Sequence, residues 1–271
     1  MKPFIYSYVN ILVLLRKSDF KNCLILMPKK PIISIITVVY NCVDLLSNTI
    51  KSVADQTYPN VEYIIVDGGS SDGTVEVIEK YANHISQWIS EPDKGLYDAM
   101  NKGLKMATGD FVWFMNAGDH IYASDTLEKM INKWQPDTDI LYGEVMLVDE
   151  TRKELGTRTA TTKQKLTNPL HWKDLAKGMV VCHQGFLPRR TLAPFYIENN
   201  LTADIDWVIK CLKASKQTTA TELTVASYLV GGLSKQQHQR SLKDRYWVLK
   251  EHFGFWPNLW NHLQILLRRV F

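Results

Sequence analysis

Hydrophobic and polar positions alternate in blocks along the first half of the chain. Ile32–Val39 is an almost unbroken β-branched run, and Val61–Val66 is a second apolar run. Runs that are apolar on both faces are typical of buried parallel strands. Between them, Val43–Gln56 has apolar residues at helical spacing. The pattern therefore predicts a strand, a helix and a second strand.

The alternation of helix and strand patterns continues beyond Val66 to about residue 145. It predicts helices at Thr74–Tyr81 (with Asp72 or Ser71 as N-cap), Leu96–Ala107 and Ser124–Trp134, and strands at Ile85–Ile89, Phe111–Met115 and Ile140–Val145. Such alternation indicates an α/β fold, with a mostly parallel central sheet and right-handed crossovers. Ligands bind beyond the carboxyl ends of the strands in such sheets. We therefore expect the polar loops Tyr40–Asn41, Asp67–Asp72, Glu91–Gly95 and Asn116–Asp119 to converge on one crevice.

The pattern is weaker after about Glu150. It predicts a hairpin or loop at Thr151–Thr162, strands at Val180–Leu187 and Thr218–Tyr228, a helix at Ala203–Ala214, and two helices within Gln239–Phe271, broken at Pro257. We divide the chain into an N-terminal extension (1–30), a domain (31–235) and a C-terminal helical extension (236–271). Within the domain, we distinguish a first half (31–122) from a second half (123–235).

Composition narrows the class of protein. The 271 residues are 45% hydrophobic, enough for one large domain, and the net charge of +4 does not demand nucleic acid, so we expect no nucleic-acid partner. The four cysteines contain no CxxC pair. They are expected to be reduced and mostly buried, as in a cytoplasmic protein, with a disulfide or a zinc site as the less favoured interpretation.

The N-terminus carries an apolar stretch, Ile5–Leu15, that is shorter than the ~20 residues needed to span a bilayer. It lacks a small-residue cleavage site, which argues against a signal peptide. One hypothesis is that translation begins at Met27. Peptides from upstream of Met27 in the natively expressed protein would refute it.

Two of the strand-end loops carry candidate carboxylates. Asp67 precedes two glycines, which allow a ligand close to the backbone, and it could accept a hydrogen bond from a base or a ribose. It could equally cap the next helix. Asp119, at the end of Asn116-Ala117-Gly118-Asp119, suits a divalent cation that takes its other ligands from phosphate. An ordinary surface turn is the alternative.

The segment Glu91–Gly103 is dense in polar residues. Lys94 lies at a helix start, where phosphates bind readily. Asp98, Asn101 and Lys102 are spaced to share one helix face, and an intrahelical ion pair from Asp98 to Lys102 is expected.

Three further positions could take part in catalysis. Asp204 and Asp206 lie in the first turn of a predicted helix, where they could complement the helix dipole or supply a general base. His183-Gln184 follows an apolar run, and a lone histidine there is more often structural.

The motifs together resemble the family 2 glycosyltransferases with the GT-A fold. The resemblance covers Pro31–Tyr228 and rests on SIITVVYN, QTYPNVEYIIVDGGSSDGT, EPDKGLYDAMNKGLKMATGD and FMNAGD, followed by the weaker HQGFLPRR and ADID. It looks like the branch that builds bacterial surface polysaccharides, including colanic-acid-type transferases.

The resemblance implies that 31–122 is the nucleotide-donor half of the domain and 123–235 the acceptor half, and it implies a role for each candidate. Val38, Tyr40 and Asp67 would hold the nucleoside, with Tyr40 stacking on the base. Asp93 and Lys94 would lie near the diphosphate, and Asn116 and Gly118 would complete the nucleotide-sugar site. Asp119 would ligate Mg²⁺ or Mn²⁺, Asp204 would be the base with Asp206 as second choice, and His183 and Gln184 would border the acceptor or the leaving diphosphate.

The metal motif departs from the family pattern, because Asn116 and Gly118 flank a single acid where the family's DXD motif has two or three. The missing carboxylate weakens metal binding, and phosphate oxygens could offset the loss. The implied reaction is inverting transfer of a hexosyl or N-acetylhexosaminyl group, from a nucleotide-sugar that is a UDP-sugar by resemblance alone, to a saccharide or polyprenyl-linked acceptor. A sugar nucleotidyltransferase and a degenerate, non-catalytic nucleotide-binding module remain alternatives.

The tail 236–271 mixes basic residues with aromatic residues and leucines. This composition suits the surface of an anionic membrane. It would place a cytoplasmic protein peripherally on the inner face of the cell membrane. A helix pair that packs on the domain is the alternative.

Overall fold

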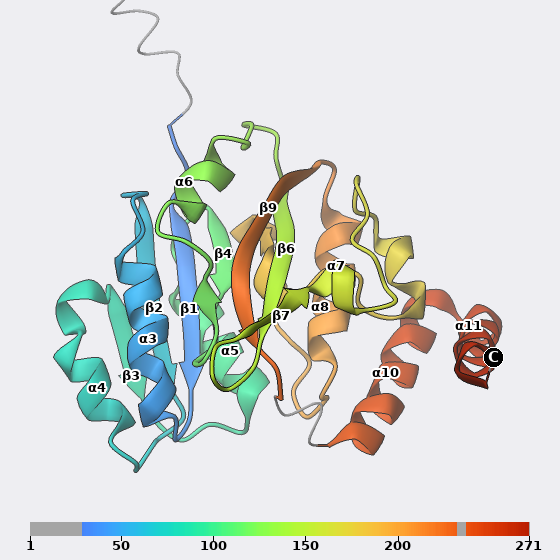
Figure 1. Ribbon diagram of the computed structural model, residues 1–271, viewed down its shortest axis with the longest axis horizontal. Helices are drawn as coiled ribbons and strands as arrows, with labels where there is room; N and C mark the ends of the chain where they lie inside the picture. The colour runs from blue at the N-terminus through green and yellow to red at the C-terminus, as the bar shows by residue number, and fades with distance from the viewer. Residues whose placement is uncertain (1–28, 232–236, 271) are drawn as a thin grey trace, which may run out of the picture. The chain divides into compact units, whose positions relative to one another are not determined.

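A parallel sheet forms the first part of the fold. The computed structural model describes residues 29–231 and 237–270. Strands β1 (Ile33–Val39), β2 (Val61–Asp67), β3 (Gln87–Ser90) and β4 (Phe111–Phe114) pair in the order β3-β2-β1-β4, and every pair is parallel (Figure 1). The predicted strands and the α/β fold are confirmed, with shifts of one or two residues at their ends.

Helices cover both faces of this sheet. The main ones are α3 (Val43–Ala54), α4 (Thr74–Lys80) and α5 (Leu96–Met106). Alternate residues of β1 enter different cores: Ile36 packs in the same cluster as Leu104 of α5, whereas Ile35 packs in the same cluster as Leu46 of α3. This burial on both faces explains why the strand sequence is apolar throughout.

A second, mixed sheet lies beside the first. It contains β5 (His120–Ile121), β9 (Thr218–Leu229), β6 (Ile140–Val148) and β7 (Glu154–Thr157) in that order, and β8 (Phe186–Pro188) pairs with β6. β6 and β9 run parallel along most of their length. The smaller elements are η1 (Ala82–His84), α6 (Thr126–Ile131), α7 (Arg158–Thr161), η2 (Trp172–Lys177), η3 (His183–Gly185) and η4 (Arg190–Leu192).

Two local predictions in the domain were wrong, in addition to the position of the break between the C-terminal helices. In Val180–Leu187, only the last two residues are strand, because a 3-10 turn closed by the bond from Gly185 N to Cys182 O (2.9 Å) interrupts it. The N-cap of α4 is Gly73, in the left-handed conformation at φ 99°. Asp72 instead accepts the backbone N–H of Thr74 (3.0 Å) and of Val43 (3.1 Å), so it ties together the starts of α3 and α4.

Three helices form the C-terminal part: α8 (Ala203–Ala214), α10 (His238–Phe253) and α11 (Phe255–Val270). The break between the last two lies at Gly254 (φ 83°) rather than at Pro257. Pro257 lies in the first turn of α11, where a proline is tolerated because the first N–H groups have no intrahelical partner. Val248 and Leu249 of α10 join the main core.

The remaining structural expectations concern the cysteines and the N-terminus. Cys42, Cys182 and Cys211 are free thiols, and of these only Cys211 is fully buried. Cys23, the stretch Ile5–Leu15 and Met27 lie outside the described residues. Within 29–231 and 237–270, no helix has the length and apolar character to cross a membrane.

Candidate active site

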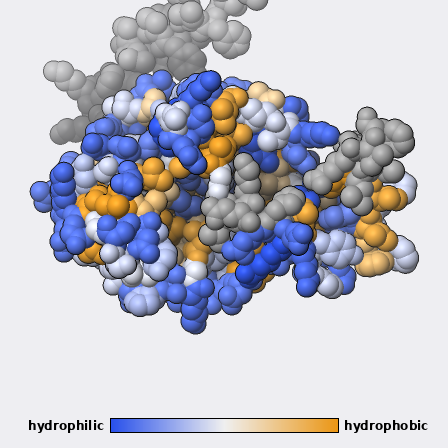
Figure 2. Space-filling model, turned by 60° about the horizontal axis from the view of Figure 1, so that its bottom comes forward, coloured by the Kyte–Doolittle hydropathy of each residue, from blue (hydrophilic) through white to orange (hydrophobic). Residues whose placement is uncertain are grey.

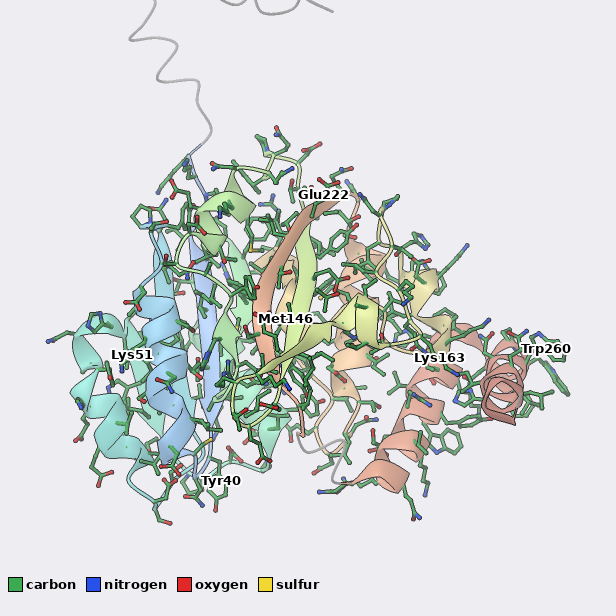
Figure 3. The ribbon with its side chains drawn as sticks, in the orientation of Figure 1. Tyr40, Lys51, Met146, Lys163, Glu222 and Trp260 are labelled. Carbon is green, nitrogen blue, oxygen red and sulfur yellow. The ribbon has the colours of Figure 1, made fainter. Side chains whose placement is uncertain are left out.

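Backbone hydrogen bonds join the loops that follow the parallel strands. Gly68 N donates to Val39 O (2.9 Å), Glu91 N donates to Asp67 O (3.0 Å), and Ala117 N donates to Val38 O (3.3 Å). The loops after all four strands therefore meet at one edge of the sheet, as the sequence predicted. Figure 3 shows this edge at the lower end of the molecule, where Tyr40 lies.

Gly68 lies between two of the predicted donor-site residues. A Cβ atom at this position would come within 2.3 Å of Asp93 Oδ2 and 3.3 Å of Tyr40 Cδ2. The Tyr40 side chain is 63% exposed. An exposed aromatic ring beside a glycine leaves room for a flat ligand to approach, and only glycine fits at the point where the two loops meet.

Asp67 is completely buried and holds its own loop. Its carboxylate accepts the N–H groups of Gly69 (3.1 Å) and Ser70 (2.9 Å), and the hydroxyls of Ser70 (2.5 Å) and Ser90 (2.6 Å). Four donors therefore fix the Gly68–Ser70 backbone against the end of β3. A contact between Asp67 and a nucleoside stays a prediction.

The loop before α5 is organised by carboxylates and leaves one lysine exposed. Asp93 Oδ1 accepts Gly95 N (2.7 Å), and Asp98 Oδ2 accepts Lys94 N (3.0 Å). The expected pair Asp98–Lys102 is present at 3.7 Å, although Lys102 lies closer to Glu91 (2.8 Å). Lys94 is exposed. In the part of the chain that the structure describes, its ammonium has no hydrogen bond or ion pair.

Asp119 is buried, so the turn that contains it is not an ordinary surface turn. Its Oδ2 accepts Gln184 Nε2 (2.8 Å), and its Oδ1 accepts Leu229 N (3.0 Å). Burial raises the pKa of Asp119 to about 7, although these hydrogen bonds and the charge of Arg152 act in the opposite direction. Arg152 itself donates to Gly118 O (2.6 Å) and lies 2.6 Å from His120 Nδ1.

The residues around Asp119 fit a divalent cation that brings most of its own ligands. Asn116 Oδ1 is buried and has no hydrogen-bond partner among the residues that the structure describes. It belongs to the same turn, since Asp119 N donates to Asn116 O (2.9 Å). Among the described residues, no group of three or more His, Cys, Asp or Glu side chains could hold a metal. One carboxylate and one amide oxygen suit Mg²⁺ or Mn²⁺, which would complete its shell with phosphate and water oxygens.

Asp204 lies in the first turn of α8 and is half-buried. Burial raises its pKa to about 6, while the N–H of Ile205 (2.9 Å from Oδ1), the hydroxyl of Tyr97 and the charge of Arg158 favour its ionised form. A carboxylate with this pKa is ionised at neutral pH and remains basic enough to take a proton.

The two carboxylates Asp119 and Asp204 act on the same neighbours. Burial is the main cause that raises the pKa of the Tyr228 phenol, and it is also the main cause that raises the pKa of the Cys182 thiol to about 12. The charges of Asp119 and Asp204 contribute to both shifts in the same direction. Electrostatic effects of this kind require proximity. Asp119 and Asp204 therefore both lie within electrostatic range of Tyr228 and Cys182.

Asp206 is directed elsewhere. It is buried, and its carboxylate pairs with Lys210 Nζ (2.8 Å) and His252 Nε2 (2.8 Å). Burial opposes ionisation, but the hydrogen bonds from His252 and Lys210 outweigh it and hold the pKa of Asp206 below its usual range. This pairing joins α8 to α10.

His183 and Gln184 support the site from within the core. The His183 ring packs against Phe114 and Trp207, lies 2.6 Å from the Tyr196 hydroxyl, and has its pKa lowered to about 4 by burial. It is therefore neutral at physiological pH. Gln184 holds Asp119, and its carbonyl accepts Trp113 Nε1 (2.7 Å).

Several residues near the site were not predicted from the sequence. They are Tyr97, Arg152, Arg158, Cys182 and Tyr228. Arg152 and Arg158 fall where the hydrophobic pattern is weak, and a single arginine there carries no signal of its own. Arg158 reaches the site because it donates to the carbonyls of Val180 (2.8 Å) and Met179.

Comparison with known proteins agrees with this geometry. The chain is 31% identical over 216 residues to the PGL/p-HBAD biosynthesis glycosyltransferase of Mycobacterium bovis, covering 75% of this chain and 79% of that protein. It is 27% identical over 228 residues to a glycosyltransferase of Haemophilus influenzae, covering 82% and 88%. Neither of these names specifies a colanic-acid transferase, so the similarity does not single out that branch.

Solved structures share the GT-A-like fold. Staphylococcus aureus TarS 1-349, in complex with UDP-GlcNAc, matches with a TM-score of 0.64 at 18% identity, covering 80% of this chain but only 64% of that one. The mannosyltransferase PcManGT from Pyrobaculum calidifontis, in complex with GDP-Man and Mn²⁺, matches with a TM-score of 0.57 at 14% identity, covering 90% and 81%.

The family assignment rests on the segment that builds the strand-end site. The sequence profile of Glycosyl transferase family 2 matches residues 34–193, more than half of the chain and from β1 to beyond β8. The chain is therefore a nucleotide-sugar-dependent glycosyltransferase of family 2.

Proposed function

We propose that the protein transfers a sugar from a nucleotide-sugar to a hydroxyl group of a saccharide or polyprenyl-linked acceptor, with inversion at the anomeric carbon. The observation that carries the proposal is a pair of carboxylates: Asp119 is held by Gln184 and Leu229 beside the strand-end loops, and Asp204 lies in the first turn of α8. We assign Asp119 to the diphosphate side and Asp204 to the acceptor side.

Donor recognition would begin at the outer end of the sheet. Tyr40 is exposed beside Gly68 and would stack on the base, while the exposed ammonium of Lys94 would attract the diphosphate. The hydrogen bonds of Asp67 would keep this loop in place before the donor arrives, so that little ordering entropy is lost on binding. Asp93, which touches the position of Gly68, would limit the size of the slot.

The chemical step would depend on Asp204. Its carboxylate would accept the proton of the acceptor hydroxyl as the oxygen attacks the anomeric carbon, from the face opposite the nucleotide. The bond to the diphosphate oxygen breaks, and the electron pair leaves with the nucleoside diphosphate. Arg158 and Lys94 would add positive charge around the leaving group. A divalent cation held by Asp119 and Asn116 would supply Lewis-acid stabilisation of that charge.

The identity of the donor is proposed from the relatives. TarS was solved with UDP-GlcNAc and PcManGT with GDP-Man and Mn²⁺, so both uridine and guanosine donors occur on this fold. We propose a UDP-hexose or UDP-N-acetylhexosamine donor and a surface-polysaccharide pathway. The acceptor would be reached from the cytoplasmic side of the membrane, where a polyprenyl-linked saccharide is presented.

A donor panel and a pair of matched variants would test the function. Thermal shift with UDP- and GDP-sugars, with and without Mn²⁺, identifies the base through stabilisation by one donor. Release of nucleoside diphosphate from that donor is then compared for the wild type, Asp204→Asn and Asp206→Asn. We expect Asp204→Asn to lose activity and Asp206→Asn to keep it in folded protein. Stabilisation by a donor without any turnover in the wild type would instead indicate a non-catalytic binding module.

A further inference from the structure

The last helix, α11, presents its apolar residues to solvent. Trp256, Leu259, Trp260 and Leu263 lie at positions i, i+3, i+4 and i+7, which is one face of a helix, and all four are exposed, Trp256 by 76% and Trp260 by 60%. Figure 3 shows Trp260 pointing away from α10 and the body of the domain. Figure 2 shows hydrophobic side chains gathered at this end of the molecule.

The polar residues of α11 make the contacts with the domain. Asn258 is buried and donates to Tyr246 O of α10 (3.1 Å), and Asn261 donates to Ala176 O of η2 (3.2 Å). This orientation is the reverse of an ordinary surface helix, whose apolar face packs on the core. The polar side of α11, which water could have solvated, packs on the domain instead. The apolar stripe therefore remains exposed and available to bind another surface.

The charged residues near the apolar stripe of α11 indicate which kind of surface it binds. Residues 255–270 contain no acid and end in Arg268-Arg269 before the last valine. At the other end, Lys250 Nζ lies 4.5 Å from the ring centre of Trp247 and 5.9 Å from that of Phe255, and Trp247 is itself exposed. Tryptophans at the depth of lipid headgroups, with basic residues beside them, are typical of helices that lie in the interface of an anionic membrane.

We infer that α11 is a membrane-docking helix that inserts Trp256, Leu259, Trp260 and Leu263 into the interface of an anionic phospholipid bilayer. The inference rests on the proposed function in one respect: docking would hold the active site near a lipid-linked acceptor. The docking itself is independent of the transfer reaction.

Sedimentation with vesicles tests the inference on the full chain. Vesicles of phosphatidylcholine alone are compared with vesicles that also contain phosphatidylglycerol, for the wild type and for the double variant Trp256→Gln/Trp260→Gln. The matched control is Phe195→Gln/Ile197→Gln, which removes two exposed apolar side chains from another part of the surface. All four positions are exposed, so both variants should fold, which circular dichroism checks.

We expect the wild type and the control to bind the anionic vesicles, and the α11 variant to bind them about a hundredfold more weakly, since each of the two buried tryptophans contributes about a factor of ten. Equal binding by the α11 variant and the wild type would overturn the inference. So would a wild type that stays in the supernatant but is dimeric by light scattering, with the α11 variant monomeric. Release of nucleoside diphosphate in solution should be the same in all three proteins, so failure of docking and failure of the proposed function can be told apart.

Discussion

The buried carboxylate of Asp119 should reduce the stability of the protein at neutral and higher pH. An aspartate in the unfolded chain has a pKa near 3.8, and burial raises the folded value to about 7. Because the folded pKa is the higher one, folding favours the protonated acid. Stability linked to this group is fully present below pH 3.8 and is lost as pH rises to 7.

The size of this effect follows from the shift. About three pH units at 1.36 kcal/mol each give a cost of about 4 kcal/mol above pH 7, and of about 2 kcal/mol at pH 5. The variant Asp119→Asn removes the titration. The amide oxygen of the variant can still accept from Leu229 N, but its NH₂ group faces Gln184 Nε2, so the variant gives up about 1 to 2 kcal/mol of hydrogen bonding. At pH 8 the variant should be more stable than the wild type by about 2 kcal/mol, and at pH 5 about equal to it.

Urea denaturation of both proteins at pH 5 and pH 8, without metal or donor, measures the difference. Asp206→Asn is the control, because the pKa of Asp206 is lowered and lies outside this window. Asp206→Asn should be destabilised at both pH values, because its ion pair with Lys210 is lost. If the difference between Asp119→Asn and the wild type does not change from pH 5 to pH 8, the burial argument fails. The same variant should lose transfer, because the carboxylate that lowers stability is the one proposed for the metal.

Three further predictions concern the site. At saturating donor, kcat should fall about tenfold per pH unit below about 6, because Asp204 must be ionised to act as base; a flat profile from pH 7 to pH 5 would place the base elsewhere, and Asp206→Asn should keep the wild-type profile. The Cβ of Gly68→Ala would come within 2.3 Å of Asp93 Oδ2, so this variant should displace the Asp93 side chain. It should lower the transfer rate on the order of a hundredfold, with only a small change in melting temperature. A donor affinity that calorimetry finds unchanged would contradict the proposal that Asp93 and Gly68 shape the donor slot. Burial lowers the pKa of His183 from 6.5 in the unfolded chain to about 4 in the folded protein, so the folding stability linked to this group is present above pH 6.5 and is lost as pH falls toward 4. In urea titrations, His183→Phe should remove this part of the loss of stability in acid. An acid dependence identical to that of the wild type would show that His183 is not buried in its neutral form.

Local pattern was enough for the first half of the fold. Each residue of β1 is buried, and α3 shows four buried residues at helical spacing, so hydrophobicity along the chain reports burial directly. The loops that follow the strands could then be assigned to one edge, because parallel strands end on the same side. The strands β6 and β9 of the second sheet were also predicted, but their pairing was not. They lie about 80 residues apart in the chain, and pairing between distant strands is decided by register and packing rather than by local sequence.

In the site, too, the sequence could propose single side chains, and only the tertiary structure could separate them. Asp204 and Asp206 are two residues apart on α8 and have the same chemistry, so the sequence could only rank them. The structure separates them because residues two apart on a helix face different directions. Asp204 lies near Arg158 and Tyr97, whereas Asp206 meets Lys210 and His252.

The sequence by itself determined the class of fold, the strand-end loops, the family resemblance and the candidate carboxylates. These depend on short-range patterns and on the order of motifs. Only the tertiary structure decided that Asp119 is buried with a raised pKa, that it and Asp204 act on the same buried tyrosine, and that the polar side of α11 packs on the domain while its tryptophans face outward. The reason is that burial, proximity and the choice of helix face are set by residues far away in the chain, which meet only when it folds.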